Sequence, residues 1–285
     1  MLVVEARHMG MCFGVKDALE TMRSLPEPDL VTVHGELVHN PVVIKEIDAL
    51  GFHQQNETNR SMSPTTEQVL ITAHGVSNRV KESFENQGYK VHDTTCPLVR
   101  RAHKAALHFH KKGYFIVLIG RAGHVEVEGL AGDLSEYRIV NEPDHVESYL
   151  ATKICVVNQT TTRPDRLEMF HRRIRALNPN KDIEFVDTTC QPTKDRQTAV
   201  KELLRRVEAL VVVGGPNSNN TRQLGIQAQE QGLPWFHVAE SAELRAEWFQ
   251  NFRVVGLSAG TSTTDATIRE VAKRLRGFGR QKLTA

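Results

Sequence analysis

The sequence predicts an α/β protein with mainly parallel sheets. Short runs of β-branched and other apolar residues recur along the chain, and they are continuously apolar rather than alternating, which is typical of strands buried on both faces. Amphipathic helical patterns lie between them, as at residues 163–177 and 198–209. This succession of strand, loop and helix indicates the α/β class. The expected strands are 2–5, 69–72, 115–119, 154–157, 210–213 and 254–257.

A near-repeat predicts how these elements are grouped. Residues 93–96 and 187–190 both read Asp-Thr-Thr-Cys, each after a short apolar strand and before a basic amphipathic helix. Cys12 also follows a strand and precedes a helix, and the successive spacings of the three cysteines are 84 and 94 residues. We therefore predict three similar α/β units, 1–95, 96–189 and 190–285, each with one cysteine at a strand-to-helix junction.

Each predicted unit also has two polar loops that follow its strands. In open α/β sheets, ligands bind outside the carboxyl ends of the strands, where such loops gather. If the three units are arranged around an axis, the six loops and three cysteines would meet in one central cavity. The loops are residues 34–40, 73–77, 120–126, 158–161, 214–220 and 258–262.

Composition and charge exclude several classes of protein. The chain of 285 residues has a net charge of +2, which is too balanced for bulk attraction to nucleic acid or to a membrane surface. No apolar run approaches the roughly 18 residues that span a bilayer. Glu5 and Arg7 stand where a secretion signal needs apolar residues, and four cysteines do not form a disulfide framework. We therefore expect a cytoplasmic protein without a nucleic-acid or membrane partner.

The cysteines fall into two kinds. Cys155 lies inside an apolar run, and we expect it to be a buried, inert thiol. Cys12, Cys96 and Cys190 lie at loop edges before predicted helices, whose N-termini stabilise thiolates. Three convergent thiolates suit a soft metal site. An iron–sulfur cluster with one iron not bound by the protein fits better than zinc, which usually takes four protein ligands in a structural site, but zinc stays an alternative.

The polar loops indicate an anion site beside the thiols. His39, His74 and His124 lie in loops that contain Gly or Asn, and protonated imidazole can pair with phosphate, whereas we expect most other histidines to be packed or solvated. The loops 217–220 and 258–262 are rich in Asn, Ser and Gly, which can cradle an anion. The chain has neither a Walker A motif nor a Gly-x-Gly-x-x-Gly motif. The predicted ligand is a small diphosphate-like anion, and Glu126, with Thr160 in a sister loop, is a candidate proton donor.

These motifs occur together in one known family. The chain resembles the 4-hydroxy-3-methylbut-2-enyl diphosphate reductase family, whose motifs it matches in family order over almost its whole length. The resemblance implies a trefoil of three pseudo-threefold-related α/β units around a central iron–sulfur cluster. The matching stretches are residues 10–15, 38–40, 73–77, 95–99, 123–129, 159–161, 189–190, 217–220 and 258–262.

The resemblance also implies a site and a reaction. Cys12, Cys96 and Cys190 would bind three irons of a 4Fe–4S cluster, which can become 3Fe–4S on oxidation, and the fourth iron would be left for the substrate's hydroxyl. Glu126, linked to Thr160, would supply the proton that lets the hydroxyl leave as water. Two electrons from a ferredoxin- or flavodoxin-type donor would give isopentenyl or dimethylallyl diphosphate, the last step of the non-mevalonate isoprenoid pathway. The residues implied to hold the diphosphate are His39, His74, His124, Ser218, Asn220 and Ser262, with Asn219 as a variable neighbour.

The chain departs from the family pattern at several positions without losing a cluster ligand or the proton donor. Two alternatives remain open on the sequence: a paralogous iron–sulfur reductase with another hydroxylated substrate, and a non-catalytic iron–sulfur redox sensor. Retention of Glu126 and Thr160 argues against a sensor, which needs no proton donor. The departures are His8, Met9, Val125 in place of Pro, Pro216 in place of Lys, and Thr264 in place of Pro.

Overall fold

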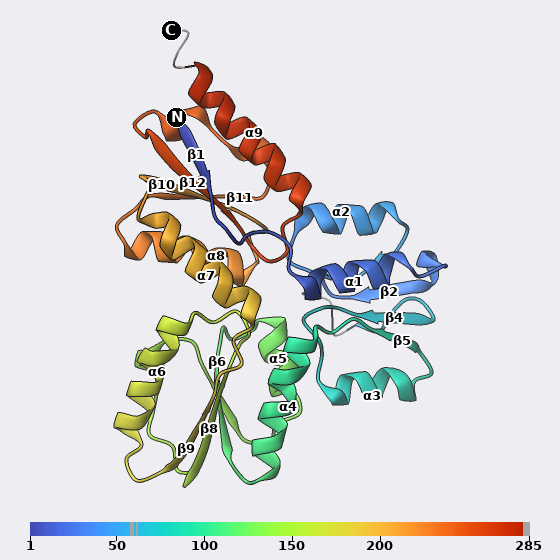
Figure 1. Ribbon diagram of the computed structural model, residues 1–285. Helices are drawn as coiled ribbons and strands as arrows, with labels where there is room; N and C mark the ends of the chain where they lie inside the picture. Colours follow the sequence, from blue (N-terminus) through green and yellow to red (C-terminus); the bar gives the residue numbers. More distant parts are fainter. Residues whose placement is uncertain (58–59, 61, 282–285) are drawn as a thin grey trace. The chain divides into compact units, whose positions relative to one another are not determined.

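The computed structural model describes residues 1–57, 60 and 62–281 (Figure 1). The chain divides into two compact units. We call them the terminal unit and the middle unit. The terminal unit contains Met1–Phe13, His39–Val43 and Gln191–Ala285, and the middle unit contains Gly14–Val38 and Ile44–Cys190.

The described residues form three sheets of four strands, and every pair of neighbouring strands is parallel. The prediction of an α/β protein with parallel sheets is therefore confirmed. The terminal unit holds the sheet β11 (Trp235–Val238), β10 (Ala209–Val213), β12 (Val254–Ala259), β1 (Leu2–Glu5). The middle unit holds two sheets: β3 (His53–Gln54), β2 (Val31–His34), β4 (Gln68–Ile71), β5 (Lys90–Asp93), and β7 (Tyr137–Val140), β6 (Phe115–Ile119), β8 (Lys153–Asn158), β9 (Asp182–Val186).

All three sheets have the same topology. The strands are counted from β10 in the terminal unit, where β1 is the fourth, and from β2 and β6 in the middle unit. In each sheet they lie in the spatial order second, first, third, fourth, so the order reverses between the first and third strands. Parallel sheets bind ligands at this switch point, outside the carboxyl ends of the strands. The six polar loops follow the first and third strands of the three sheets, which are β2 and β4, β6 and β8, β10 and β12. Each predicted ligand loop thus leaves a strand beside a switch point.

One strand lies outside the unit to which the sequence assigned it. The predicted first unit, 1–95, includes Leu2–Glu5, but this strand, β1, pairs with β12 and supplies the fourth strand of the terminal unit's sheet. The fourth strands of the other two sheets, β5 and β9, are local in sequence. The three repeats are therefore cyclically permuted along the chain, and each cysteine follows the fourth strand of a sheet. The boundaries at 95 and 189 stay a prediction.

Helices cover the faces of the sheets (Figure 1). In the terminal unit, α9 packs against β1 and β10, while α7 and α8 pack against each other and against β12, β10 and β11. In the middle unit, α4 packs against β6 and β8 and against α5. The helices are α1 (Phe13–Arg23), α2 (Pro41–Ala49), α3 (Asn78–Asn86), α4 (Pro97–Lys111), α5 (Val125–Ala131), α6 (Pro164–Leu177), α7 (Gln191–Leu204), α8 (Asn219–Glu230) and α9 (Asp265–Gln281), with short 3₁₀ helices at Pro28–Leu30, Pro143–His145, Ser241–Glu243 and Ala246–Phe249.

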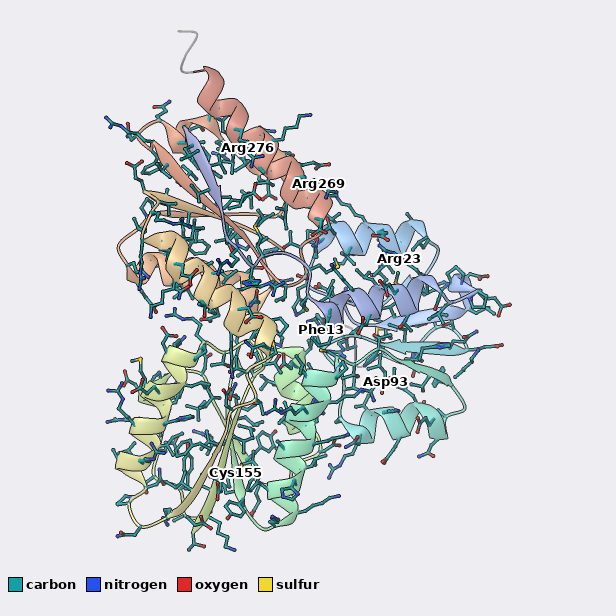
Figure 2. The ribbon with its side chains drawn as sticks, viewed as in Figure 1. Phe13, Arg23, Asp93, Cys155, Arg269 and Arg276 are labelled. Carbon is teal, nitrogen blue, oxygen red and sulfur yellow. The ribbon has the colours of Figure 1, made fainter. Side chains whose placement is uncertain are left out.

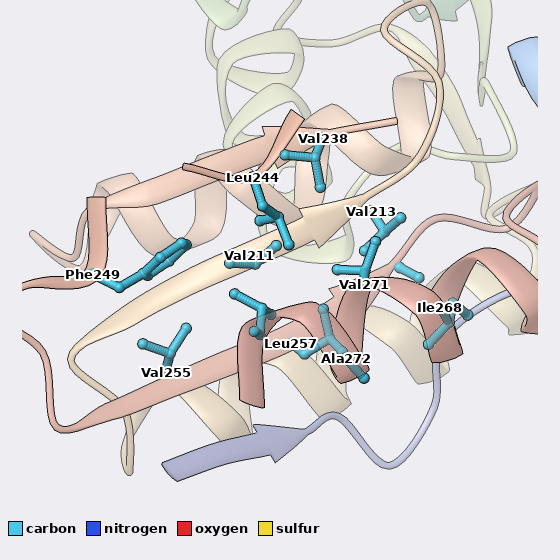
Figure 3. Close-up of a cluster of buried hydrophobic side chains, with 12 residues drawn as sticks. Val211, Val213, Val238, Leu244, Phe249, Val255, Leu257, Ile268, Val271 and Ala272 are labelled. Carbon is cyan, nitrogen blue, oxygen red and sulfur yellow. The ribbon is translucent and has the colours of Figure 1, made fainter. Parts of the chain in front are cut away.

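The continuously apolar strands β4, β6, β8, β10 and β12 are buried on both faces, as their sequences predict. The expected strand 2–5, β1, lies at the edge of its sheet and is partly exposed. Along β10, Val211 and Val213 pack with residues of α9, whereas Leu210 and Val212 pack with residues of α7 and α8 on the other face (Figure 3). Successive side chains of a strand point to opposite faces, so a strand with a helix layer on each side must be apolar throughout. In the middle unit β8 alternates in the same way between the α6 face and the α4 face.

One sequence expectation about a helix is wrong in its limits. The helix expected at 198–209 is α7, which begins at Gln191 and ends at Leu204, and Ala209 already belongs to β10. Pro192 is tolerated in the first turn of a helix, which allows α7 to start directly after Cys190. At the other end of the unit, α9 continues to Gln281, and Leu275 of this helix is buried against the sheet. Residues 282–285 lie outside the described residues.

Candidate functional site

The three repeat cysteines occupy equivalent positions. Each follows the fourth strand of a sheet and directly precedes a helix: α1, α4 and α7. In each case the backbone N–H of the cysteine donates to the carbonyl of the second residue after the sheet's third strand. These hydrogen bonds are Cys12 to Thr261 (2.9 Å), Cys96 to Ala73 (3.1 Å) and Cys190 to Thr160 (2.9 Å). The predicted equivalence of the three junctions is thus a feature of the backbone as well as of the sequence.

The Asp-Thr-Thr-Cys motif is a hydrogen-bonded turn that presents the cysteine. The Asp93 carboxylate accepts hydrogen bonds from the Thr95 N–H (3.1 Å) and hydroxyl (2.6 Å), and Asp187 accepts one from the Thr189 N–H (2.9 Å). Burial alone would raise the pKa of Asp93, but the hydrogen bonds from Thr95 and Lys81, together with the Arg100 charge, outweigh it and lower that pKa. The acid of each motif therefore fixes the turn that leads into the cysteine's helix.

Exposure separates the three junction cysteines from the fourth. Cys12, Cys96 and Cys190 are partly exposed cysteines outside any disulfide, whereas Cys155 is fully buried inside the β6–β8–β9 sheet (Figure 2). Burial, followed by the nearby Glu184 charge, raises the pKa of Cys155 to about 12. Cys155 is therefore the inert core thiol that its sequence context predicts.

In the middle unit, the thiol of Cys96 is packed closely against the start of α1. A Cβ atom added to Gly14 would lie 2.4 Å from the Cys96 Sγ atom. Any larger residue at position 14 would therefore displace the thiol. This steric requirement explains a glycine in the first turn of a helix, where glycine otherwise lowers stability.

In the terminal unit, three loops interlock around Ser262. The Ser262 hydroxyl donates to the His39 carbonyl (3.4 Å), and the Asn40 amide donates to the Ser262 carbonyl (2.6 Å). The backbone at Gly215 approaches so closely that a Cβ atom there would lie 2.1 Å from the His39 carbonyl oxygen. The loops after β2, β10 and β12 are therefore in direct contact, which brings the predicted residues His39 and Ser262 together.

The other predicted residues of the terminal unit lie at the N-terminus of α8. Ser218 is the N-cap, and its hydroxyl accepts a hydrogen bond from the Thr221 N–H at 3.3 Å. Asn219 and Asn220 begin the helix, and the Asn220 side chain accepts from the Thr261 N–H (3.1 Å) next to Ser262. The structure thus gathers Ser218, Asn220 and Ser262 at a helix N-terminus, where the helix dipole favours an anion.

In the middle unit, Glu126 and Thr160 form a buried pair. The side chain of Glu126 is 2% exposed and Thr160 is 4% exposed. The two Glu126 carboxylate oxygens accept hydrogen bonds from the Thr160 N–H (2.6 Å) and the Thr160 hydroxyl (3.0 Å). Burial disfavours the charged carboxylate, whereas these two hydrogen bonds stabilise it. Because the Thr160 carbonyl accepts the Cys190 N–H, a hydrogen-bonded path links the candidate proton donor to a junction cysteine.

One predicted histidine lies beside this pair in sequence, and a second contacts the first in space. His124 is the N-cap of α5, and its Nδ1 accepts a hydrogen bond from the Glu126 N–H at 3.2 Å. A neutral His124 therefore carries its proton on Nε2, which makes that atom a donor. The rings of His74 and His124 meet edge to face, with centroids 5.7 Å apart. The structure thus brings His74, His124, Glu126 and Thr160 together within the middle unit.

A separate cleft of about 510 Å³ opens in the middle unit beside these loops. It is lined by Gly75 to Ser77 and by residues of α3 and α5, and Arg60 and Glu57 form an ion pair at its wall. None of the predicted site residues lines it, among the described residues. The cleft nevertheless borders the predicted side chains, because a carboxylate oxygen of Glu57 lies within 4.8 Å of a ring nitrogen of His74.

The departures from the family pattern fall on local structure rather than on the hydrogen-bonded groups above. Val125 is the first residue of α5, a position that proline also suits, and Thr264 accepts a hydrogen bond from the Thr267 N–H at the start of α9. Met9 packs against the core on both faces of the terminal unit's sheet, while His8 and Pro216 are exposed.

The family follows from comparison with known proteins. The family model described as LytB protein matches residues 3–276. The chain belongs to the LytB protein family. Among curated relatives, it is 35% identical to a 4-hydroxy-3-methylbut-2-enyl diphosphate reductase of Methylibium petroleiphilum, over 97% of this chain and 85% of that protein. It is 34% identical to the protein of the same name from Aquifex aeolicus, over 96% of this chain and 95% of that protein.

Solved structures agree with this LytB assignment. The E-1-hydroxy-2-methyl-but-2-enyl-4-diphosphate reductase of Plasmodium falciparum matches with a TM-score of 0.87 and 26% identity, over 95% of this chain and 87% of that one. A second structure, of (E)-4-hydroxy-3-methyl-but-2-enyl diphosphate reductase, matches with a TM-score of 0.67 and 32% identity, over 97% and 100%. Among the described residues of this LytB protein, no helix has the length and apolar character to span a bilayer.

Two residues of the terminal unit were not singled out by the sequence. Asn40 connects the loop after β2 to Ser262, and Arg196 donates to the carbonyl of Gly10 beside Cys12. The position of Asn40 directly after His39 was an available signal. Nothing local distinguishes Arg196 from the many exposed arginines of this chain, because its partner is 186 residues away.

Proposed function

We propose that this LytB protein reductively dehydroxylates 4-hydroxy-3-methylbut-2-enyl diphosphate to isopentenyl and dimethylallyl diphosphate, the last step of the non-mevalonate isoprenoid pathway. The observation that carries the proposal is the match of nearly the whole chain, in sequence and in fold, to reductases of this name. No observation favours a paralogue with another substrate. The buried Glu126–Thr160 pair, which a sensor would not need, disfavours a redox sensor.

The cofactor that we propose is a 4Fe–4S cluster held by Cys12, Cys96 and Cys190. The donor set fits such a group, because the three thiols are partly exposed at helix N-termini in equivalent backbone positions. Zinc is less suitable, since none of these cysteines belongs to a Cys-x-x-Cys pair and a fourth protein ligand is not indicated. When bound, the cluster would supply electrons and a Lewis-acid iron, and the 3Fe–4S form is its expected oxidation product.

The terminal unit would hold the substrate's diphosphate. Ser218, Asn219 and Asn220 lie at a helix N-terminus, and Ser262 and His39 lie in the loops that contact it. Hydroxyl, amide and backbone N–H donors fixed by hydrogen bonds lose little freedom when an anion binds. His74 and His124 of the middle unit would add imidazole donors to the same anion.

The middle unit would supply the proton. Hydroxide is a poor leaving group, so a general acid is needed for the hydroxyl to leave as water. Glu126 is buried and held by Thr160 in a single orientation, as this role requires. Thr160 would keep the carboxyl group aimed while the proton moves. The reaction also needs two electrons and a second proton, which adds to either end of the substrate's allylic carbons and gives isopentenyl or dimethylallyl diphosphate. The electrons must come from outside the chain, and we propose a ferredoxin- or flavodoxin-type protein as their donor.

An anaerobic assay tests the reaction. Cluster-loaded protein is mixed with 4-hydroxy-3-methylbut-2-enyl diphosphate and dithionite, and the products are separated chromatographically. We expect isopentenyl and dimethylallyl diphosphate at catalytic turnover numbers. Failure of a fully loaded protein to consume this substrate would refute the proposed activity.

Cysteine variants test the cluster assignment. Replacing Cys12, Cys96 or Cys190 with Ser should remove most bound iron and sulfide and the brown chromophore, because each thiolate holds one iron. The matched control is Cys155→Ser, which should keep both. Loss of iron in Cys155→Ser with retention in Cys12→Ser would show that the ligands are assigned wrongly.

A further inference from the structure

A buried arginine holds the loop that carries Cys12. Arg196 lies on α7 in the terminal unit and is 7% exposed. Arginine is almost never fully buried unless its charge and its N–H groups are satisfied. Arg196 therefore needs a structural or electrostatic reason, and the surface arginines of the same unit do not.

The guanidinium of Arg196 donates two hydrogen bonds to one carbonyl near the proposed cluster ligand. Its Nε and Nη2 both donate to the Gly10 carbonyl, at 3.1 and 2.5 Å, and its Nη1 donates to the Pro192 carbonyl at 2.9 Å. Gly10 is two residues before Cys12. A lysine could not form the same set of hydrogen bonds, because only arginine has a planar fork of N–H groups.

The rest of the loop is fixed by backbone contacts that leave Arg196 as its side-chain clamp. The N–H of Gly10 donates to Ala259 (3.2 Å) and the N–H of Cys12 donates to Thr261 (2.9 Å). Gly10 has a φ of +78°, and a Cβ atom there would lie 2.7 Å from Ile268 Cδ1. The loop is thus fixed by two backbone hydrogen bonds to the end of β12 and the loop after it, and Arg196 adds its hydrogen bonds to the Gly10 carbonyl.

Arg196 also brings a permanent positive charge. A guanidinium does not lose its proton in proteins, so the charge is present at every relevant pH. The helix that carries it begins directly after Cys190, another proposed ligand. A nearby positive charge favours thiolates over thiols, and it favours the more negative, reduced state of a metal cluster.

We propose that Arg196 is a positioning residue for Cys12 that also raises the reduction potential of the bound cluster. This inference rests on the proposed function, since it needs Cys12 to be a cluster ligand. It assigns two effects to one side chain: the fork fixes the ligand loop, and the charge stabilises the reduced cluster. Lysine at this position would supply the charge without the fork.

The test compares three variants of the reconstituted holoenzyme. Arg196→Gln removes the fork and the charge, and Arg196→Lys removes only the fork. The matched control is Arg276→Gln, on α9 of the same unit, whose arginine forms an exposed ion pair with Glu5 of β1 (Figure 2). The readouts are the rate of iron release in air and the midpoint potential in an anaerobic titration, and neither depends on substrate turnover.

We expect Arg196→Gln to release iron about tenfold faster than the wild type, which corresponds to losing a charge-assisted hydrogen bond. Its ratio of reduced to oxidised cluster should also fall about tenfold at a fixed potential, a shift of about 59 mV for a one-electron couple. Arg196→Lys should release iron faster than the control yet keep a potential near that of the wild type. If Arg196→Gln fails to fold, the comparison of Arg196→Lys with the control still tests the proposal.

The inference is overturned if both Arg196 variants match Arg276→Gln in iron release and in potential. A wild-type protein that binds no cluster under anaerobic reconstitution would instead refute the proposed function. The two failures are therefore distinguishable in the same set of measurements.

Discussion

The two units support their candidate site residues in different ways. In the terminal unit, Ser218, Asn220 and Ser262 are neutral donors fixed to a helix N-terminus and to two loops. In the middle unit, the corresponding loops carry ionisable groups, with Glu126 buried against Thr160 and His124 capping α5. The same sheet topology would thus serve the two purposes that we propose. Anion binding needs prearranged N–H and O–H donors, whereas proton transfer needs a buried group that can change its charge.

Buried and partly buried histidines extend through the middle unit beyond the candidate site. Burial lowers the pKa of His34, His92, His103 and His171, and for His34 it falls from 6.5 to about 4. A neighbouring Arg60 charge also lowers the pKa of His34, and a hydrogen bond with Gln55 partly opposes the shift. We infer that the middle unit is the part of the molecule whose stability and chemistry respond to pH.

The largest expected effect sharpens this contrast at the proton donor. Glu126→Gln keeps the size and hydrogen-bonding capacity of the side chain but has no proton to give. We predict that kcat falls by about two to four orders of magnitude, the usual contribution of a general acid, while cluster content and KM change little. Steady-state kinetics with iron analysis measure this. Turnover within a few-fold of the wild type would mean that the proton comes from another group.

A smaller effect tests whether the middle unit is the pH-sensitive one. His34 is neutral when folded, so its contribution to stability is fully present above pH 6.5 and is lost as pH falls towards 4, because the unfolded chain takes up the proton first. Between pH 7 and pH 4, protonation of His34 in the unfolded chain should lower the unfolding free energy of the wild type by about 3 kcal/mol. His34→Gln should lack this part of the decrease. Urea titrations at each pH measure the difference.

The control for this experiment is His53→Gln, which replaces an exposed histidine in the same unit. Its stability should follow that of the wild type over the same pH range. Parallel curves for wild type and His34→Gln would show that buried His34 does not account for acid sensitivity.

The smallest of the three effects concerns the neutral donors of the terminal unit. Ser262→Ala should raise KM about tenfold and leave kcat within about twofold, because a hydrogen bond to a charged group contributes about 1.5 kcal/mol to binding. Ser241→Ala, in the same unit but in the 3₁₀ helix after β11, is the control. A fall in kcat at unchanged KM would assign Ser262 to the chemical step rather than to binding.

Much of this architecture could be predicted from the sequence because its signals are local. A few consecutive residues are enough to identify each of three features: the continuously apolar strands, the polar loops after them and the Asp-Thr-Thr-Cys turns. The pairing of β1 with β12 could not be predicted, since residues 2–5 carry no signal that distinguishes a first-sheet strand from a partner of residues 254–257. That pairing moves the Cys12 junction into the sheet at the other end of the chain.

The same limit applies within the candidate site. The Glu126–Thr160 pair could be predicted, because each residue stands in a loop of the same repeat after a strand. Arg196 could not be assigned a role, because its partner Gly10 is distant in sequence, and the one signal for Asn40 was its position directly after His39. Side chains whose function is to hold another loop in place leave no pattern at their own positions.

The most direct test of the contrast between the units is the affinity of the anaerobic holoenzyme for inorganic diphosphate. Titration calorimetry would compare the wild type, Asn220→Ala and Glu126→Gln, with Asn217→Ala as the exposed control from the same loop. We predict that Asn220→Ala binds diphosphate at least about tenfold more weakly, while Glu126→Gln and Asn217→Ala bind it as the wild type does. Loss of affinity in Glu126→Gln, with full affinity in Asn220→Ala, would contradict the assignment of diphosphate binding to the terminal unit.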